Sequence, residues 1–154
     1  MNRKMVLTVT TFVIFATLFS FFNIYSKEEE KKMGKFAIIL QAGKETHEGK
    51  ARALHALMYA LELKEKGHKV VLIFDGAGTE WIEALTNPTE KTGFESIYDQ
   101  LKEKGVIEVI CDFCATAFKV HKKLEERKIS MANDFLGHPS ISKWASQGYQ
   151  IVVL

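Results

Sequence analysis

The chain has 154 residues, enough for one globular domain with a core of its own, and its 47% hydrophobic and 26% charged residues are typical of globular proteins. The net charge of +2 and the scattered lysines exclude the basic surface that a nucleic-acid partner requires. Two segments of unlike composition follow each other along the chain. The first holds a long uncharged, mostly apolar stretch, and the second alternates between apolar runs and amphipathic stretches.

The first segment has the properties of a membrane anchor. Residues 5–25 contain no charged side chain and match the ~20 residues that a helix needs to cross a bilayer. We predict an uncleaved signal anchor over residues 1–26, with a cleaved signal peptide as the alternative, and a charged tether over residues 27–34. Arg3 and Lys4 favour an N-terminus inside the cell and an extracytoplasmic (periplasmic) soluble domain, although the lysines of the tether oppose this orientation.

From residue 35 onward the pattern predicts alternating strands and helices. Apolar runs indicate strands at 35–40, 70–74, 106–110 and 149–154, with a short one near 129–131. Helical spacing indicates helices over 47–66, from 79 onward, over 94–104 and over 115–127, with another beginning after 138. This order predicts a three-layer α/β/α domain over residues 35–154, with a mostly parallel sheet of about five strands, preceded by the N-terminal hydrophobic helix. In such a sheet the functional crevice lies beyond the carboxyl ends of the strands.

The two cysteines stand at one of these strand ends. Cys111 follows the run VIEVI directly, and Cys114 is expected at the first turn of the next helix. Free amide groups and the helix dipole at that position favour a thiolate, so we predict a lowered pKa and nucleophilic character for Cys114, opposed in part by Asp112. Cys111 is equally consistent with a small apolar residue that fills the strand.

Three kinds of chemistry suit a C-x-x-C pair. Zinc needs four ligands, and His121 is the one imidazole near the cysteines in sequence, so we expect no metal site. A dithiol redox motif agrees with the position at a strand-to-helix junction, although the proline-containing thioredoxin signature is absent. A persulfide carrier needs only one activated cysteine and tolerates a second one beside it.

A second group of candidate residues follows two other strands. Asp75, Gly76, Gly78 and Thr79 come after the strand at 70–74, where glycines let the backbone approach a ligand or a neighbouring cysteine. A tight turn with a helix cap explains the same residues without a ligand. His47 follows the first strand and is a candidate acid or base because its usual pKa is close to neutral.

Several ordered motifs together resemble one family. The stretch QAGKETHEGKARALHALMYALELKEKGHKVVLIFDGAGTEWI, the junction CDFCATAF and the ending GHPSISKWASQGYQIVVL resemble DsrE/DsrF-like proteins over residues 35–154. The resemblance implies a compact α/β fold, homo-oligomers such as trimers or hexamers, and a sulfur relay in which a cysteine persulfide passes sulfur to a partner. It assigns the sulfur-bearing role to Cys114, with Cys111 beside it and the second group of candidates at the pocket.

Three hypotheses remain open from the sequence. The first is a sulfur carrier that exchanges sulfur with a donor or acceptor protein or a small thiol, without a cofactor. The second is a dithiol–disulfide redox protein that uses Cys111 and Cys114. The third is a non-catalytic oligomeric binding module in which the cysteines are inert.

Overall fold

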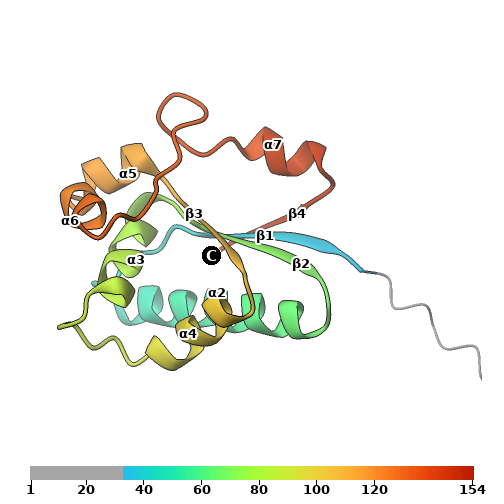
Figure 1. Cartoon of the computed structure of the whole chain (residues 1–154), viewed down its shortest axis with the longest axis horizontal. Helices are drawn as coiled ribbons and strands as arrows, with labels where there is room; N and C mark the ends of the chain where they lie inside the picture. The colour runs from blue at the N-terminus through green and yellow to red at the C-terminus, as the bar shows by residue number, and fades with distance from the viewer. Residues whose placement is uncertain (1–32) are drawn as a thin grey trace, which may run out of the picture. The chain divides into compact units, whose positions relative to one another are not determined.

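A four-stranded, all-parallel sheet forms the centre of the domain (Figure 1). The structure is a computed structural model that describes residues 33–154. The strands lie in the order β3-β2-β1-β4, and their bounds are β1 Lys35–Leu40, β2 Lys69–Phe74, β3 Ile107–Ile110 and β4 Gln150–Val153. This confirms the predicted α/β class with a parallel sheet.

Apolar side chains on both faces explain why these segments form central strands. Successive side chains of a strand point to opposite faces, so a continuous apolar run fits only a sheet that is covered on both sides. In β1, Ile38 and Leu40 join the larger core, whereas Ala37 and Ile39 join a smaller core on the other face. The same alternation continues in the neighbouring strand β2.

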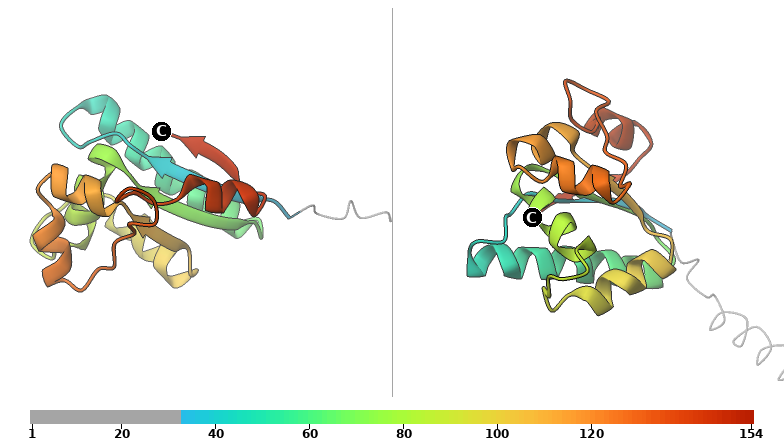
Figure 2. Two further views of the ribbon diagram at one scale, coloured as in Figure 1. Left: turned by 90° about the horizontal axis from the view of Figure 1, so that it is seen from above. Right: turned by 60° about the vertical axis from the view of Figure 1, so that its left-hand side comes forward.

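Helices cover the two faces unequally. The larger core lies under α2 (His47–Glu65), α3 (Thr79–Thr86) and α4 (Glu95–Glu103). The other face is packed by Trp144 of the short helix α7 (Ile141–Ser146). Two views of the ribbon show α2 and α4 on one side of the sheet and α7 on the other (Figure 2). The domain is therefore built from three layers, one of them thin.

The structure corrects two predicted elements. The segment 129–131 adds no fifth strand. The chain forms a single parallel bridge, between Cys111 just after β3 and Ala132 just after this segment, before it turns away. The helix expected over 115–127 is interrupted at Lys119, whose φ of 61° ends one helix before the next begins. The two resulting helices are α5 (Asp112–Ala117) and α6 (His121–Glu126).

The predicted anchor and most of the tether lie outside the described residues. Within residues 33–154, no helix combines the length and the apolar character that crossing a membrane requires.

The turn after β2 packs its backbone directly against β1. Gly78 lies in a short 3-10 turn over Gly76–Gly78, and a Cβ atom added to it would meet the carbonyl oxygen of Leu40. Because the obstacle is backbone, a side-chain movement cannot relieve the contact. Gly78 is thus required for the close packing that holds this turn at the carboxyl end of the sheet.

We expect Gly78→Ala to destabilise the domain by about 3 kcal/mol or more, because the added methyl group forces β1 and the turn apart. Urea denaturation followed by circular dichroism measures the loss. Gly105→Ala is the matched control: its Cβ would meet nothing within 4 Å, and it carries only the cost of a positive φ, roughly 1–2 kcal/mol. Equal losses in the two variants would contradict this role of Gly78.

Candidate functional site

Parallel pairing brings the ends of β2 and β3 side by side. Phe74 stands opposite Ile110 in the register, and the backbone N–H of Cys111 donates to the carbonyl of Phe74 at 3.0 Å. The next residues, Asp75 and Cys111, therefore emerge at neighbouring points of the same sheet edge. The structure thus brings together two of the residues predicted from the strand ends.

The two cysteines form a close pair of free thiols. Cys111 is the N-cap of α5, and its sulfur accepts the backbone N–H of Cys114 at 3.2 Å. The two Sγ atoms lie 2.7 Å apart, whereas a disulfide bond measures about 2.05 Å. Both side chains are buried, with 0% of Cys111 and 6% of Cys114 exposed. This pair is placed to form a bond with little movement.

The carboxylate of Asp75 links this pair to the first strand. Its Oδ1 accepts the thiol hydrogen of Cys114 at 3.1 Å, and its Oδ2 accepts the amide of Gln41 at 2.8 Å. Burial raises the pKa of Asp75, but hydrogen bonds from Gln41, from both thiols and from the Gly76 N–H outweigh burial and lower this pKa overall. Asp75 is consequently a carboxylate at neutral pH.

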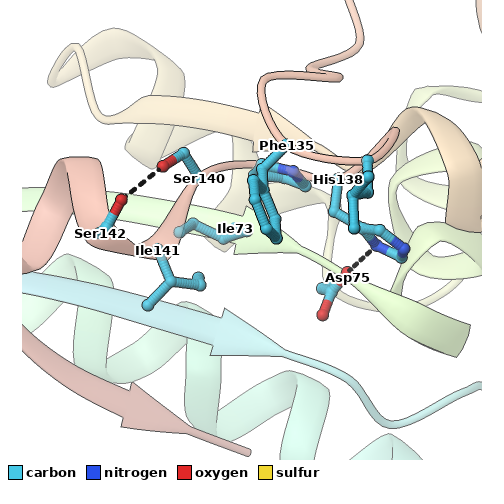
Figure 3. A pocket seen from close by; sticks show the side chains of 9 residues that line it. Ile73, Asp75, Phe135, His138, Ser140, Ile141 and Ser142 are labelled. Atoms are coloured by element: carbon cyan, nitrogen blue, oxygen red, sulfur yellow. Dashed lines mark hydrogen bonds and ion pairs between the residues drawn. The ribbon is translucent and has the colours of Figure 1, made fainter.

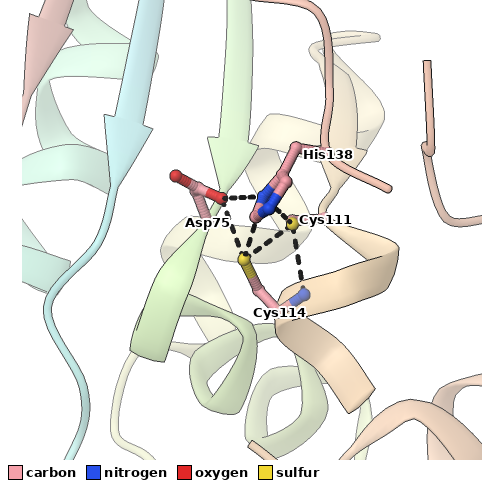
Figure 4. Close-up of side chains that lie close together, drawn as sticks. All are labelled: Asp75, Cys111, Cys114 and His138. Carbon is pink, nitrogen blue, oxygen red and sulfur yellow. Dashed lines mark hydrogen bonds and ion pairs between the residues drawn. The ribbon is translucent and has the colours of Figure 1, made fainter. Parts of the chain in front are cut away.

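His138 completes the cluster from a distant part of the chain (Figure 4). Its Nδ1 lies 3.2 Å from Cys111 Sγ, 3.6 Å from Cys114 Sγ and 4.0 Å from Asp75 Oδ1. The imidazole also packs on the ring of Phe113, with centroids 4.8 Å apart. Four donor atoms, one from each of Asp75, Cys111, Cys114 and His138, lie within 4.8 Å of one another.

A tight turn places His138 there. Phe135 and His138 exchange two backbone hydrogen bonds of 2.8 Å, and the residues between them, Leu136 and Gly137, both adopt positive φ. The carbonyl of Gly137 accepts the N–H of Phe113 at 3.0 Å, which fastens the turn to the start of α5. His138 was not among the predicted site residues, because the sequence pattern after residue 138 indicates only the start of a helix.

Burial and negative charge hold the thiols in the protonated form. Burial raises the pKa of Cys111, and the hydrogen bond with Cys114 raises it further. Burial also raises the pKa of Cys114. The hydrogen bond from Cys111 and the Gly76 N–H oppose this effect, the neighbouring Asp75 carboxylate adds to it, and the pKa is raised overall. The predicted lowering of the Cys114 pKa by the helix start is therefore wrong, because burial raises this pKa.

A cavity of about 510 Å³ borders the cluster (Figure 3). Asp75 and His138 line it on the side of the thiols, and apolar groups line much of the remainder, including Ile73, Phe135, Leu136, Pro139 and Ile141. A small molecule in this cavity would meet the two polar side chains that contact the cysteines. The cavity thus provides a partly apolar approach to the site.

The other residues considered from the sequence, His47, His121 and Thr79, lie outside the cluster of cysteines, Asp75 and His138. His47 is exposed at the first position of α2 and belongs neither to the cluster nor to the lining of this cavity. His121 lies on α6 and bonds Asp112 at 2.9 Å, so neither joins the cluster. Thr79 donates its hydroxyl to the carbonyl of Gly76 at 2.9 Å and is a structural residue of the turn.

Comparison with known proteins agrees with the described geometry. Residues 34–154 match the DsrE/DsrF-like family. The chain belongs to this family. The uncharacterized protein MJ0733 of Methanocaldococcus jannaschii is 34% identical to it over 103 residues, which cover 66% of this chain and 78% of that protein.

A solved structure supports the fold of this DsrE/DsrF-like domain. The conserved protein of unknown function BT1422 from Bacteroides thetaiotaomicron superposes with a TM-score of 0.54 and 18% sequence identity. The superposition covers 78% of this chain and 94% of that one. At this level of identity the likeness concerns the fold.

We expect Asp75→Asn to speed the alkylation of Cys114 by iodoacetamide at neutral pH. The substitution removes the negative charge that disfavours the thiolate, so the pKa of Cys114 falls and its thiolate fraction rises. Each unit of lowered pKa should raise the rate about threefold, because the added thiolate outweighs its reduced nucleophilicity. Peptide mass spectrometry over a pH series measures the rate at Cys114 separately from Cys111.

Asp112→Asn is the matched control, since its carboxylate bonds His121 and does not contribute to the raised Cys114 pKa. A slower reaction in Asp75→Asn than in the native chain would show that Asp75 assists the thiolate and would contradict this electrostatic account.

Proposed function

We propose that this DsrE/DsrF-like protein carries sulfur as a persulfide on Cys114. The observation that supports this function best is the contact of one sulfur atom with two different groups. Cys114 Sγ meets the Asp75 carboxylate at 3.1 Å and the Cys111 thiol at 2.7 Å. The first contact offers a proton acceptor for loading, and the second offers a thiol for release.

Loading requires a base at the moment of attack, because the thiol of Cys114 rests in its protonated form. The proton passes to Asp75 or to His138, whose Nδ1 lies 3.6 Å from the sulfur. The thiolate attacks the outer sulfur of a donor persulfide, R–S–SH, and the donor's S–S bond breaks. Cys114 then carries S–SH, and the donor leaves as a thiolate that takes up the proton.

Release has two routes. An acceptor thiol attacks the outer sulfur and removes it, which regenerates Cys114 as a thiolate. Alternatively, Cys111 attacks the inner sulfur, hydrosulfide leaves, and a Cys111–Cys114 disulfide forms. The second route needs a later reduction by an external thiol. The donor or acceptor is a small thiol compound or the thiol of a partner protein, and the adjoining cavity is large enough to receive a small thiol.

Loading is tested on the full-length, reduced and metal-free chain with inorganic polysulfide as the sulfur donor. In Cys111→Ser we expect a gain of about 32 Da on Cys114, the mass of one sulfur atom, seen by intact and peptide mass spectrometry. The native chain should instead proceed to the disulfide and release sulfide, because Cys111 can attack the inner sulfur. Cys114→Ser should remain unmodified under the same conditions.

The urea-unfolded chain serves as the control for an ordinary thiol. Native Cys111→Ser should accept sulfur at least about tenfold faster than its unfolded form, since a positioned base assists the transfer. Its alkylation by iodoacetamide should be slower than in the unfolded form, because burial raises the thiol pKa. A polysulfide reaction that is also slower in the native protein would contradict the carrier function.

Dithiol–disulfide exchange is the second candidate, and the 2.7 Å contact of the two sulfurs favours it. The extracytoplasmic location expected from residues 5–25 would favour it as well, because disulfides persist in oxidising compartments. Equilibration with mixtures of reduced and oxidised glutathione should then give a single two-electron transition between the dithiol and the Cys111–Cys114 disulfide. If the pair stays reduced in every mixture while Cys111→Ser still accepts sulfur, the redox function is contradicted and the carrier function is the one that remains.

A further inference from the structure

Two thiols, one imidazole and one carboxylate converge in the cluster of Asp75, Cys111, Cys114 and His138. We propose that these four side chains form a zinc-binding site. The segment around the cysteines holds too few ligands for zinc, which is why no metal site was expected from the sequence. The fold supplies the two further ligands, one from the end of β2 and one from the turn before α7.

The distances between donor atoms are close to those of a tetrahedral site. With Zn–S near 2.3 Å and Zn–N or Zn–O near 2.0–2.2 Å, neighbouring ligand atoms lie about 3.3–3.8 Å apart. His138 Nδ1 is 3.2 Å and 3.6 Å from the two sulfurs, and Asp75 Oδ1 is 3.1 Å from Cys114 Sγ. The Nδ1–Oδ1 distance is 4.0 Å. The two sulfurs, 2.7 Å apart, must separate by about 1 Å to admit the ion, and Asp75 Oδ1 must move slightly toward His138 Nδ1.

Hydrogen bonds from neighbouring groups already orient the ligand atoms. In metal sites, hydrogen bonds to the ligands have the same effect. Gln41 donates to Asp75 Oδ2 at 2.8 Å, which leaves Oδ1 directed toward the sulfurs. The N–H of Cys114 donates to Cys111 Sγ at 3.2 Å and would stabilise negative charge on that sulfur. His138 and Asp75 are partly exposed, with 40% and 23% of their side chains accessible, and give the ion a route from solvent.

The ligand chemistry selects zinc. Thiolate and imidazole ligands suit zinc, whereas calcium and magnesium take oxygen ligands. Four protein ligands fill a tetrahedral site and leave no position for substrate, which indicates a storage or protective role. On binding, the two thiols release their protons to solvent, and no electron is transferred. Zinc and persulfide would compete for Cys114, so the metal would hold the carrier in an unreactive state.

The zinc site is tested with Co²⁺, whose absorption reports the ligands, on the full-length metal-free chain under a phosphine reductant. We expect one Co²⁺ per chain, a near-ultraviolet thiolate-to-cobalt charge-transfer band and the visible bands of tetrahedral cobalt. Stoichiometric Zn²⁺ should abolish these bands by displacement. Zn²⁺ should also protect both cysteines from alkylation.

The ligand set is tested by single variants. Cys111→Ser and Cys114→Ser should weaken the charge-transfer band and lower the affinity at least about 100-fold, and His138→Ala and Asp75→Asn should lower it at least about tenfold. His55→Ala and Asp99→Asn are the matched controls, since both side chains are exposed on helices outside the cluster and should leave binding unchanged. Circular dichroism confirms that each variant is folded.

Two results would overturn the site: no charge-transfer band in the native reduced chain, or native affinity in both His138→Ala and Asp75→Asn. The second result remains decisive if a cysteine variant fails to fold, because His138 and Asp75 are partly exposed and do not belong to the apolar core. The site rests on geometry and not on the sulfur-carrier function. Sulfur loading is measured on metal-free protein, so the failure of either proposal is seen separately.

Discussion

The backbone N–H of Cys111 donates to the carbonyl of Phe74, and this 3.0 Å bond continues the parallel pairing of β2 and β3 beyond their last paired residues. In an antiparallel pair the two strand ends would lie at opposite edges of the sheet. Here they coincide, so the carboxylate of Asp75 and the thiol of Cys111 start from adjacent points. The first turn of α5 then returns Cys114 to the same place, and every contact of the cluster depends on this register.

Sequence reasoning located the parts of the site that depend on local pattern. The end of a buried strand is visible in the sequence as the end of an apolar run, so Asp75 and the two cysteines could be predicted as site residues. His138 could not be found in this way, because its place depends on a turn 24 residues after Cys114 in which Leu136 and Gly137 take positive φ. That turn contains no repeated apolar spacing, and its anchor is a backbone bond to Phe113. The fifth strand was predicted from a short segment, Ile129 to Met131, and its alternation of apolar and polar residues does not reveal that only one bridge will form beside it.

The error about Cys114 has an electrostatic cause. A helix start stabilises a thiolate when the sulfur lies at the first turn and stays partly solvated. In this domain α5 has six residues, the sulfur is almost fully buried, and a carboxylate accepts its hydrogen. Desolvation and like charge therefore outweigh the helix effect. Neither of them can be predicted from residues 108–118, because both depend on residues distant in sequence, Asp75 among them.

Desolvation and the negative charge of Asp75 affect the reactions proposed for these sulfurs in different ways. A lone thiolate beside Asp75 is unfavourable, so the idle pair should react slowly with a neutral electrophile. The proposed reaction with a persulfide donor would differ, because the attack could be coupled to proton transfer from Cys114 to Asp75 or His138. A divalent cation changes the balance further. Two thiolates and one carboxylate repel one another when the site holds only protein, but they become mutually compatible around a charge of +2. The cluster that suppresses an isolated thiolate is therefore well suited to a partner that brings positive charge or takes the proton away.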